Sequence, residues 1–255
     1  MRLRSLVRDP KARAAERVTV LEGPRVIEGA LDRGVTLESA YLSVGADRAF
    51  VALHDRLRSA GVGVEMLKEG VLEKVGSTVT PQPVLAVAPV TTVTLDALPG
   101  AGCVLVAVGL SDPGNAGALL RSAEASGAAG VVFCGNSVDV RSPKVARASA
   151  GALFGTRVLE EDDPVQMLES LGAVGRRRLG AVARGGDAPE TLDLAGAVAV
   201  VLGNEARGLD EHVLAHVDGR ISIPMAGAAE SLNVAIAGSV VCFEAARQRR
   251  SAGAR

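Results

Sequence analysis

The sequence predicts an α/β protein in which a small α/β sandwich domain precedes a larger domain with a mainly parallel sheet and helices on both faces. Short apolar runs alternate with amphipathic segments, which is typical of strands that alternate with helices. In the second half these runs are continuous, as in strands buried on both faces. The 255 residues, 48% of them hydrophobic, suffice for two modest domains or for one large α/β domain. We assign residues 1–95 to the first domain, 96–102 to a linker and 103–255 to the second domain.

Four short strands and the segments between them form the expected first domain. The strands are expected at residues 18–23, 37–44, 62–67 and 83–90. The helices are expected at residues 8–17, 24–34, 47–61 and 72–77. Gly34 and Gly61 end two of the helices, because glycine readily adopts the left-handed conformation that often follows a helix.

The second domain alternates more regularly and begins with the apolar run CVLVAVGL at residues 103–110. Further strands are expected at residues 130–135, 179–183, 197–203 and 221–224. Helices are expected from 113 to Gly127, from Ser142 to 150, from Asp163 to 172 and from Ser231 to 249. Ser142 and Asp163 each precede a proline, and this pair is typical of a helix N-cap followed by the first helical position.

Composition and charge narrow the function classes. Four Phe, one Tyr and no Trp leave little for a platform on which exposed bases stack. The net charge of −1 gives no global attraction to nucleic acid, yet basic residues gather locally. The clusters are six basic side chains within residues 1–17, then Arg176 to Arg178, and Arg247, Arg249 and Arg250. Such clusters suit phosphate contacts, although each one alone is also typical of solvated surface.

The cysteines and the N-terminal sequence indicate a cytoplasmic protein. Cys103, Cys134 and Cys242 lie inside apolar runs without CxxC spacing, as small core residues in a reducing compartment do. The first residues lead into polar sequence without the apolar core of a secretory leader, and no stretch approaches the length of a membrane span. We therefore expect no membrane association.

Three glycine-rich segments follow apolar runs in the second half. They are DPGNAGALLRSAEASG at 112–127, LGNEARGL at 202–209 and IPMAGAAESLNVAIAG at 223–238. In an open α/β sheet, ligands bind where strands end. The first segment forms a tight turn into a helix, whose backbone N–H groups suit an anion. The third lets the backbone approach a flat ligand, and Ser231 is expected to cap the last helix with Asn233 just inside it.

Taken together, the order and spacing of these segments resemble the three motifs of the SpoU (TrmH-like) branch of the SPOUT methyltransferases. The resemblance covers about residues 103–250, and the first 95 residues resemble the ribosomal-protein-like RNA-binding domain of many rRNA-directed members. It implies an S-adenosylmethionine-dependent enzyme that methylates ribose 2′-hydroxyls of RNA, with rRNA favoured. It also implies a trefoil knot, which the general rule against knotted chains would not suggest. The resemblance also implies a homodimer through the second domain, with the last helix contributing to the interface. Small residues of this helix such as Ala235, Ala237 and Gly238 fit such a contact.

The resemblance also assigns roles to single residues. The catalytic positions are Asn115, Arg121, Glu205, Ser231 and Asn233, and the cofactor-binding positions are Gly203, Asn204, Ile223, Met225 and Leu232. Ala206 departs from the second motif, which commonly has glycine there; a positive φ would penalise alanine. The family account makes Arg121 the activator of the hydroxyl. Because a guanidinium is a poor base at neutral pH, we prefer a role in stabilising the developing alkoxide or in clamping a phosphate.

Alternative functions remain open at this point. A tRNA-directed relative is the nearest, and a catalytically inactive RNA-binding protein is a second; the intact polar motif positions argue against the latter. A small-molecule binder on an ordinary doubly wound sheet is a third, which the third motif disfavours. His212 and His216 have the spacing of helix-borne metal ligands, but no third ligand is evident, and we expect solvated histidines and no metal.

Overall fold

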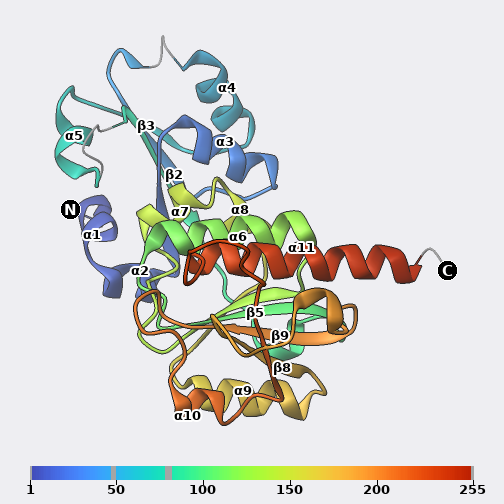
Figure 1. Cartoon of the computed structure of the whole chain (residues 1–255). Helices are drawn as coiled ribbons and strands as arrows, with labels where there is room; N and C mark the ends of the chain where they lie inside the picture. The colour runs from blue at the N-terminus through green and yellow to red at the C-terminus, as the bar shows by residue number, and fades with distance from the viewer. Residues whose placement is uncertain (1, 47–49, 78–81, 254–255) are drawn as a thin grey trace. The chain divides into compact units, whose positions relative to one another are not determined.

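The computed structural model describes residues 2–46, 50–77 and 82–253. Contacts within the chain divide it into two compact units (Figure 1). Unit 1 comprises Met1–Thr91 together with Asp139–Gly155, and unit 2 comprises Thr92–Val138 and Thr156–Arg255. The domains predicted from the sequence, 1–95 and 103–255, are each continuous in the chain. In the structure, residues 139–155 also belong to unit 1.

Unit 1 is a four-stranded mixed sheet with helices. Its strands are β1 (Val18–Glu22), β2 (Ser39–Ser43), β3 (Val64–Leu67) and β4 (Val84–Pro89), in the order β1-β4-β2-β3. Its helices are α1 (Arg2–Arg8), α2 (Pro10–Glu16), α3 (Pro24–Asp32), α4 (Val51–Ser59), α5 (Val71–Val75), α7 (Pro143–Ala148) and α8 (Ala152–Gly155). β4 runs antiparallel to β1 and β2, and β3 runs parallel to β2.

Two helix predictions in unit 1 need comment. The helix expected at 8–17 is wrong in its bounds, because the chain forms α1 and α2 with a break at Asp9. Pro10 restricts the residue before it to extended backbone, and the Asp9 carboxylate then caps α2 by accepting a hydrogen bond from the Lys11 N–H. The helix expected at 47–61 begins at residues that lie outside the described part of the chain, and α4 covers Val51–Ser59.

Unit 2 is a six-stranded parallel sheet with helices on both faces, as predicted. Its strands are β5 (Gly102–Val108), β6 (Gly130–Cys134), β7 (Val158–Glu161), β8 (Arg177–Ala181), β9 (Ala197–Leu202) and β10 (Gly219–Ile221), in the order β10-β8-β9-β5-β6-β7. Its helices are α6 (Pro113–Ser126), α9 (Pro164–Ala173), α10 (Glu211–Leu214) and α11 (Val234–Gly253), with 3₁₀ turns η2 (Leu95–Ala97) and η3 (Pro189–Thr191). Gly127 ends α6 with φ 65°, and Ser142 and Asp163 cap α7 and α9, as predicted.

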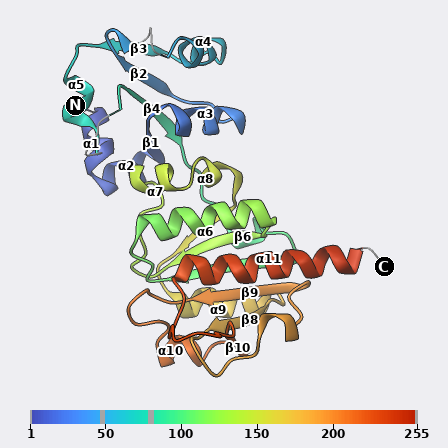
Figure 2. The same cartoon turned by 45° about the horizontal axis from the view of Figure 1, so that its top comes forward.

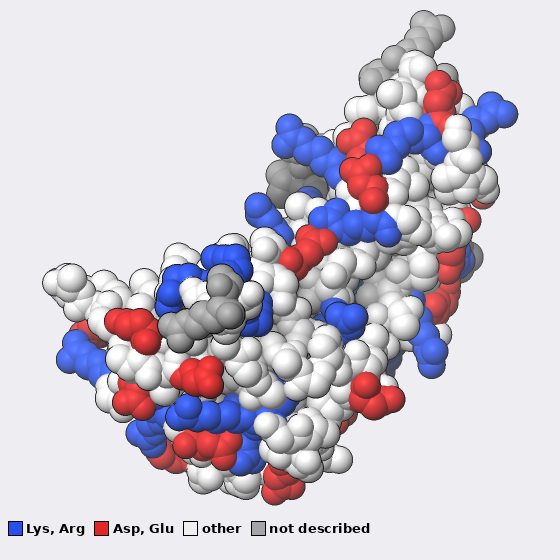
Figure 3. Space-filling view, turned by 90° about the vertical axis from the view of Figure 1, so that its right-hand side faces the viewer, with Lys and Arg blue, Asp and Glu red and all other residues white. Residues whose placement is uncertain are grey.

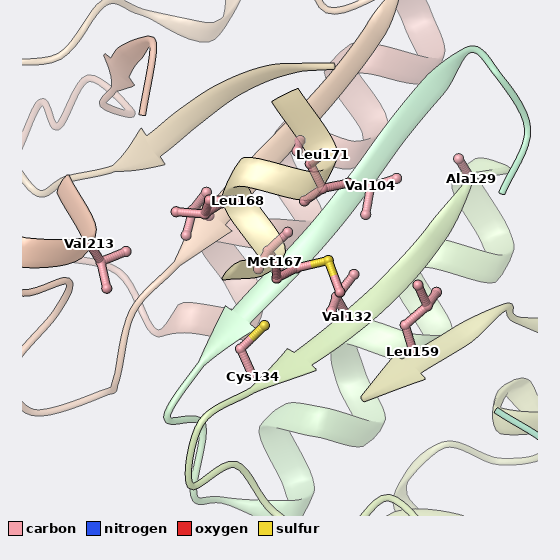
Figure 4. Packing of buried hydrophobic residues seen from close by; sticks show 12 residues of the cluster. Val104, Ala129, Val132, Cys134, Leu159, Met167, Leu168, Leu171 and Val213 are labelled. Atoms are coloured by element: carbon pink, nitrogen blue, oxygen red, sulfur yellow. The ribbon is translucent and has the colours of Figure 1, made fainter. Parts of the chain in front are cut away.

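The core of unit 2 lies on both sides of its sheet. On one side, Met167, Leu168 and Leu171 of α9 pack with Val213 of α10 against the central strands (Figure 4). On the other side α6 and α11 lie side by side, with α6 against β6 and α11 against β5 and β9 (Figures 1 and 2). The three cysteines are buried and free, and burial raises the pKa of the Cys134 thiol to about 12, which Glu161 and Asp163 reinforce. They are therefore core residues, as predicted.

Strand edges and one helix start differ from the expectations. β7 was not predicted, because VLEE carries two carboxylates and makes no apolar run; it pairs only with β6, at the edge of the sheet. β10 ends at Ile221, so the strand expected at 221–224 is wrong beyond that residue. Residues 222–233 instead return as irregular backbone to α11, which starts at Val234. This return lies in the C-terminal part of the chain, for which the resemblance implies a trefoil knot.

Residues 139–155 are bound to the N-terminal part of unit 1 by a buried ion pair. The Arg13 side chain is 5% exposed, and it donates from Nε and Nη2 to Asp139 Oδ2 at 2.9 and 2.7 Å and from Nη1 to the carbonyls of Leu6 and Val7. We expect Arg13→Ala to lower the free energy of unfolding by about 2–4 kcal/mol, because three acceptors lose their donors. Urea denaturation measures it. Arg4→Ala, at an exposed position, is the control, and equal stability of the two variants would contradict the role of Arg13.

Candidate active site

A cavity of about 600 Å³ lies in unit 2 at the carboxyl ends of three parallel strands. β8, β9 and β10 end in its wall at Ala181, Leu202 and Ile221. The cavity is lined further by the loop at 203–209 and by residues from the return segment and the start of α11. All five predicted cofactor-binding residues line it, together with three of the predicted catalytic residues: Gly203, Asn204, Ile223, Met225, Leu232, Glu205, Ser231 and Asn233.

The loop after β9 is a tight, closed turn. The backbone N–H of Asn204 donates to the carbonyl of Gly208 at 3.1 Å, and that of Gly208 donates back at 2.8 Å. The Asn204 side chain accepts from the N–H groups of Ala206 and Arg207 and donates to the Gly109 carbonyl at 2.8 Å. The positive φ of this turn falls on Gly208, at 69°, and not on Ala206. The departure from the second motif at Ala206 therefore causes no backbone strain.

Gly203 is required by close approach of the backbone and not by its own conformation. A Cβ atom there would overlap the carbonyl group of Gly208 and the N–H of Leu209. The loop folds back on the end of β9 at this point, so only a residue without a side chain lets the cavity wall close.

The Glu205 carboxylate joins the first two loops. Its Oε1 accepts from Asn115 Nδ2 at 3.1 Å and from the Asp112 N–H at 3.2 Å. Its Oε2 accepts from Asn204 Nδ2 at 3.3 Å and from Ser111 Oγ at 3.4 Å. Burial raises the pKa of Glu205, but the hydrogen bonds from Asn115 and the backbone lower it more, so the net pKa lies below its usual value. Glu205 is therefore held as an anion that accepts hydrogen bonds.

Asn233 brings the third motif into the same network. Its Nδ2 donates to Asn115 Oδ1 at 2.9 Å, while its Oδ1 accepts from the N–H groups of Ala235 and Ile236. Asn233 is thus the N-cap of α11, and the cap predicted at Ser231 is wrong, because the helix starts three residues later. Ser231 lies exposed in the cavity wall. The carboxamide of Asn115 connects Glu205 with the cap of α11.

Arg121 is the predicted site residue that stands apart. It lies six residues beyond Asn115 on α6, about 9 Å along the helix axis, and it is exposed. Within the described part of the chain its side chain makes no hydrogen bond or ion pair, and Arg121 does not line the cavity. Glu205 therefore does not hold the Arg121 side chain.

Residues that sequence reasoning missed include Asp112 and Arg207. The Asp112 side chain caps α6 by accepting from the Asn115 N–H at 2.7 Å, which fixes the start of the helix that carries Asn115. An Asp directly before Pro113 is a recognisable N-cap signal. Arg207 lines the cavity, and no pattern in the sequence marks it.

Most of the basic clusters have structural partners. Arg176 is buried and donates to the carbonyls of Gly102 and Pro99, and burial lowers its pKa. Arg178 pairs with Asp218, and Arg247 pairs with Glu244. On the face in Figure 3, basic and acidic side chains are interspersed. The described residues form no group of three or more His, Cys, Asp or Glu side chains suited to a metal ion, and none of their helices is long and apolar enough to cross a membrane.

We expect Gly203→Ala to destabilise unit 2 by about 1–3 kcal/mol, since the backbone of Gly208 and Leu209 must move away from the new methyl group. Chemical denaturation followed by circular dichroism measures it. Gly227→Ala is the matched control, because a Cβ there has open space. A Gly203→Ala protein as stable as the control would show that the loop does not need this close approach.

Two different protein families match the N-terminal and C-terminal parts of the chain. The profile of the SpoU rRNA Methylase family matches residues 102–243, and that of an MRM3-like substrate binding domain matches residues 1–86. An uncharacterized tRNA/rRNA methyltransferase of Synechocystis is 34% identical over 249 residues, 95% of this chain and 88% of the relative. A 23S rRNA (guanosine-2′-O-)-methyltransferase of Xanthomonas axonopodis is 38% identical over 158 residues, 62% of this chain and 64% of the relative.

Solved structures are similar over nearly the whole chain. The SpoU methyltransferase AviRb of Streptomyces viridochromogenes, in complex with the cofactor AdoMet, superposes with a TM-score of 0.84 at 28% identity, covering 98% of this chain and 97% of that one. An AdoMet-bound rRNA methyltransferase of Sinorhizobium meliloti gives a TM-score of 0.81 at 26% identity, covering 96% and 93%. The resemblance inferred from the three motifs is confirmed: the chain belongs to the SpoU methylase family, with an MRM3-like substrate-binding domain at its N-terminus.

Proposed function

We propose that the protein transfers the methyl group of S-adenosylmethionine to a ribose 2′-hydroxyl of rRNA. The observation that carries the proposal is a single cavity lined by the second and third motif segments. Asn115 of the first motif is joined to this cavity by its hydrogen bonds with Glu205 and Asn233. The family is one of rRNA methylases, and relatives with the same fold bind AdoMet.

The cavity suits S-adenosylmethionine in size and lining. Its volume of about 600 Å³ falls within the range of small-molecule pockets. Leu202, Ile223, Leu232 and Val234 supply apolar surface for an adenine ring, and the closed turn at Asn204–Gly208 supplies polar backbone. When bound, the cofactor supplies a methyl group already activated on its sulfonium.

The protein's task is then to align the ribose and to ease loss of its proton. Positioning carries much of such a rate enhancement. Glu205 is a weak base, because its pKa is lowered and both of its oxygens already accept hydrogen bonds. We assign it to holding Asn115 and the turn before α6, with Ser231 and Asn233 facing the ribose. Arg121, with its donors free, stabilises the developing alkoxide or clamps an adjacent phosphate.

Several observations favour rRNA over tRNA. Residues 1–86 match a substrate-binding domain, and the 23S rRNA relative is 38% identical over the part it shares. A solved structure on 2′-hydroxyl methylation of C/U34 in tRNA is similar to only 60% of this chain, with a TM-score of 0.54. Mapping 2′-O-methyl groups on rRNA and tRNA, from cells with and without the gene, decides between them. Loss of one rRNA methyl group supports the proposal, and loss only from tRNA refutes the choice of rRNA.

A homodimer is part of the proposal. Ala235 and Gly238, expected at its interface, are buried within unit 2, and a Cβ on Gly238 would lie 2.5 Å from Leu119 of α6. The exposed apolar face of α11 is instead formed by Ile236, Val240 and Phe243, at 53%, 41% and 48% exposure. Their spacing places them in one stripe along the helix, and a second copy would cover it. We also propose a cytoplasmic location, consistent with the three free cysteines.

We expect Val240→Glu and Phe243→Glu to convert the dimer to a monomer, because each places a charge in the apolar stripe. Size-exclusion chromatography with light scattering measures the mass. Val174→Glu, at another exposed apolar position of unit 2, should leave it unchanged. A monomeric wild-type protein, or variants that remain dimeric, would refute this interface.

We expect Arg121→Ala to reduce methyl transfer about a hundredfold or more while the dissociation constant of S-adenosylmethionine stays unchanged, because Arg121 does not line the cavity. Arg121→Lys should also be slow, since an ammonium lacks the planar fork of donors. Transfer of labelled methyl groups to rRNA and calorimetry measure the two effects, with Arg177→Ala as control. A parallel loss of donor affinity and rate would show that Arg121 belongs to the donor site.

A further inference from the structure

Residues 139–155 are an integral part of unit 1, although they follow strand β6 of unit 2 in the chain. Arg13 holds Asp139, and Glu22 at the end of β1 holds Arg147 of α7. The turn after α7 packs against α3 so closely that a Cβ on Gly151 would lie 3.1 Å from the carbonyl group of Gly29. Ala150 and Gly151 both have positive φ, 49° and 91°. A non-glycine residue in this conformation indicates that its surroundings hold the turn in place.

This segment changes the charge of unit 1. Residues 1–91 carry 13 basic and 11 acidic side chains, and residues 139–155 add three basic and one acidic. Unit 1 therefore has a net charge of +4, half of it from the segment, against −5 for unit 2. The substrate-binding profile ends at residue 86 and does not include this contribution.

Two of the added cations are exposed on one side of α7. Lys144 and Arg147 are three residues apart, so they lie on the same face of the helix. Within the described part of the chain, the Lys144 side chain has no ion pair. Two carboxylates form ion pairs at this segment, Asp139 with Arg13 and Glu22 with Arg147. The face thus keeps an excess of positive charge.

Glu22 orients Arg147 and does not simply neutralise it. The Glu22 side chain is 1% exposed, and it accepts from the Ser77 N–H at 2.8 Å and from Arg147 Nη1 at 3.3 Å. The Arg147 side chain is 40% exposed. A guanidinium has five N–H donors, and Glu22 receives one of them, so the others are available to an external acceptor in a restricted geometry.

We propose that Lys144 and Arg147 form a phosphate-binding surface of unit 1 for the RNA substrate, with Glu22 as the positioning residue of Arg147. The inference rests on the proposed function and names where unit 1 holds the RNA backbone. A planar guanidinium beside an ammonium suits the oxygens of adjacent phosphates. The lack of aromatic residues leaves the backbone as the main source of affinity.

Binding of a labelled RNA hairpin and of purified bacterial 23S rRNA tests the proposal, by fluorescence anisotropy over a series of salt concentrations. Lys144→Ala and Arg147→Ala should each weaken binding on the order of fivefold and reduce the slope of log Kd against log salt by about 1. Arg58→Ala, an exposed cation on α4 of the same unit, is the matched control. Slopes and affinities equal to those of the control would overturn the proposal.

Glu22→Gln separates positioning from simple electrostatics. Removal of a negative charge alone would strengthen RNA binding, whereas loss of the carboxylate that orients Arg147 should weaken it at least twofold. Unchanged or stronger binding overturns the role of Glu22. Calorimetry with S-adenosylmethionine is the control for folding, and its dissociation constant should be the same in all variants. If the wild-type protein binds RNA but methylates none, the proposed function is wrong, whereas weaker RNA binding by the Lys144 and Arg147 variants still supports the phosphate-binding surface.

Discussion

A single carboxylate links the three glycine-rich loops of unit 2. Glu205 accepts hydrogen bonds from the loop before α6 and from Asn204 of its own turn. Asn115, which also donates to Glu205, accepts a hydrogen bond from Asn233, the cap of α11. An anion with several converging donors is a stronger link than a neutral acceptor. Because these loops leave different strands and are distant in sequence, the cavity wall depends on this shared acceptor.

Close approach of backbone supplies the second constraint. Gly203 allows its loop to fold back over the end of β9, and Gly238 allows α11 to pack on α6. At both glycines, neighbouring atoms occupy the space that a side chain would fill. The return of residues 222–233 to α11 brings Ile223, Met225 and Leu232 to the cavity wall.

Much of the fold followed from local patterns in the sequence. Buried strands such as 103–110 are continuous apolar runs, and Ser142, Asp163 and Gly127 mark helix ends by chemistry that acts within one turn. The predictions were wrong where residues distant in sequence determine the local structure. Strand β7 forms because it pairs with the edge of β6. The cap of α11 lies at Asn233 and not at Ser231, and the Asn233 side chain also donates a hydrogen bond to Asn115.

The site shows the same limit. Motif spacing identified eight of the residues that line the cavity, because loops at the ends of parallel strands meet at one edge. It did not place Arg121, which belongs to the first motif but lies about 9 Å along α6 from Asn115. Nor did it assign residues 139–155 to unit 1, since their partners Arg13 and Glu22 are more than a hundred residues away. Deletion of residues 1–95 would therefore remove Arg13 and Glu22, which form the ion pairs with residues 139–155.

The most direct test of the account is the affinity of Glu205→Gln for S-adenosylmethionine, measured by calorimetry. The substitution keeps the size of the side chain, but its NH₂ group cannot accept the hydrogen bonds that now reach one carboxylate oxygen. We expect the dissociation constant to rise about tenfold or more, with Glu211→Gln, an exposed carboxylate on α10, as the matched control. A Glu205→Gln protein that binds the donor and methylates rRNA like the wild type would contradict the central role of this carboxylate.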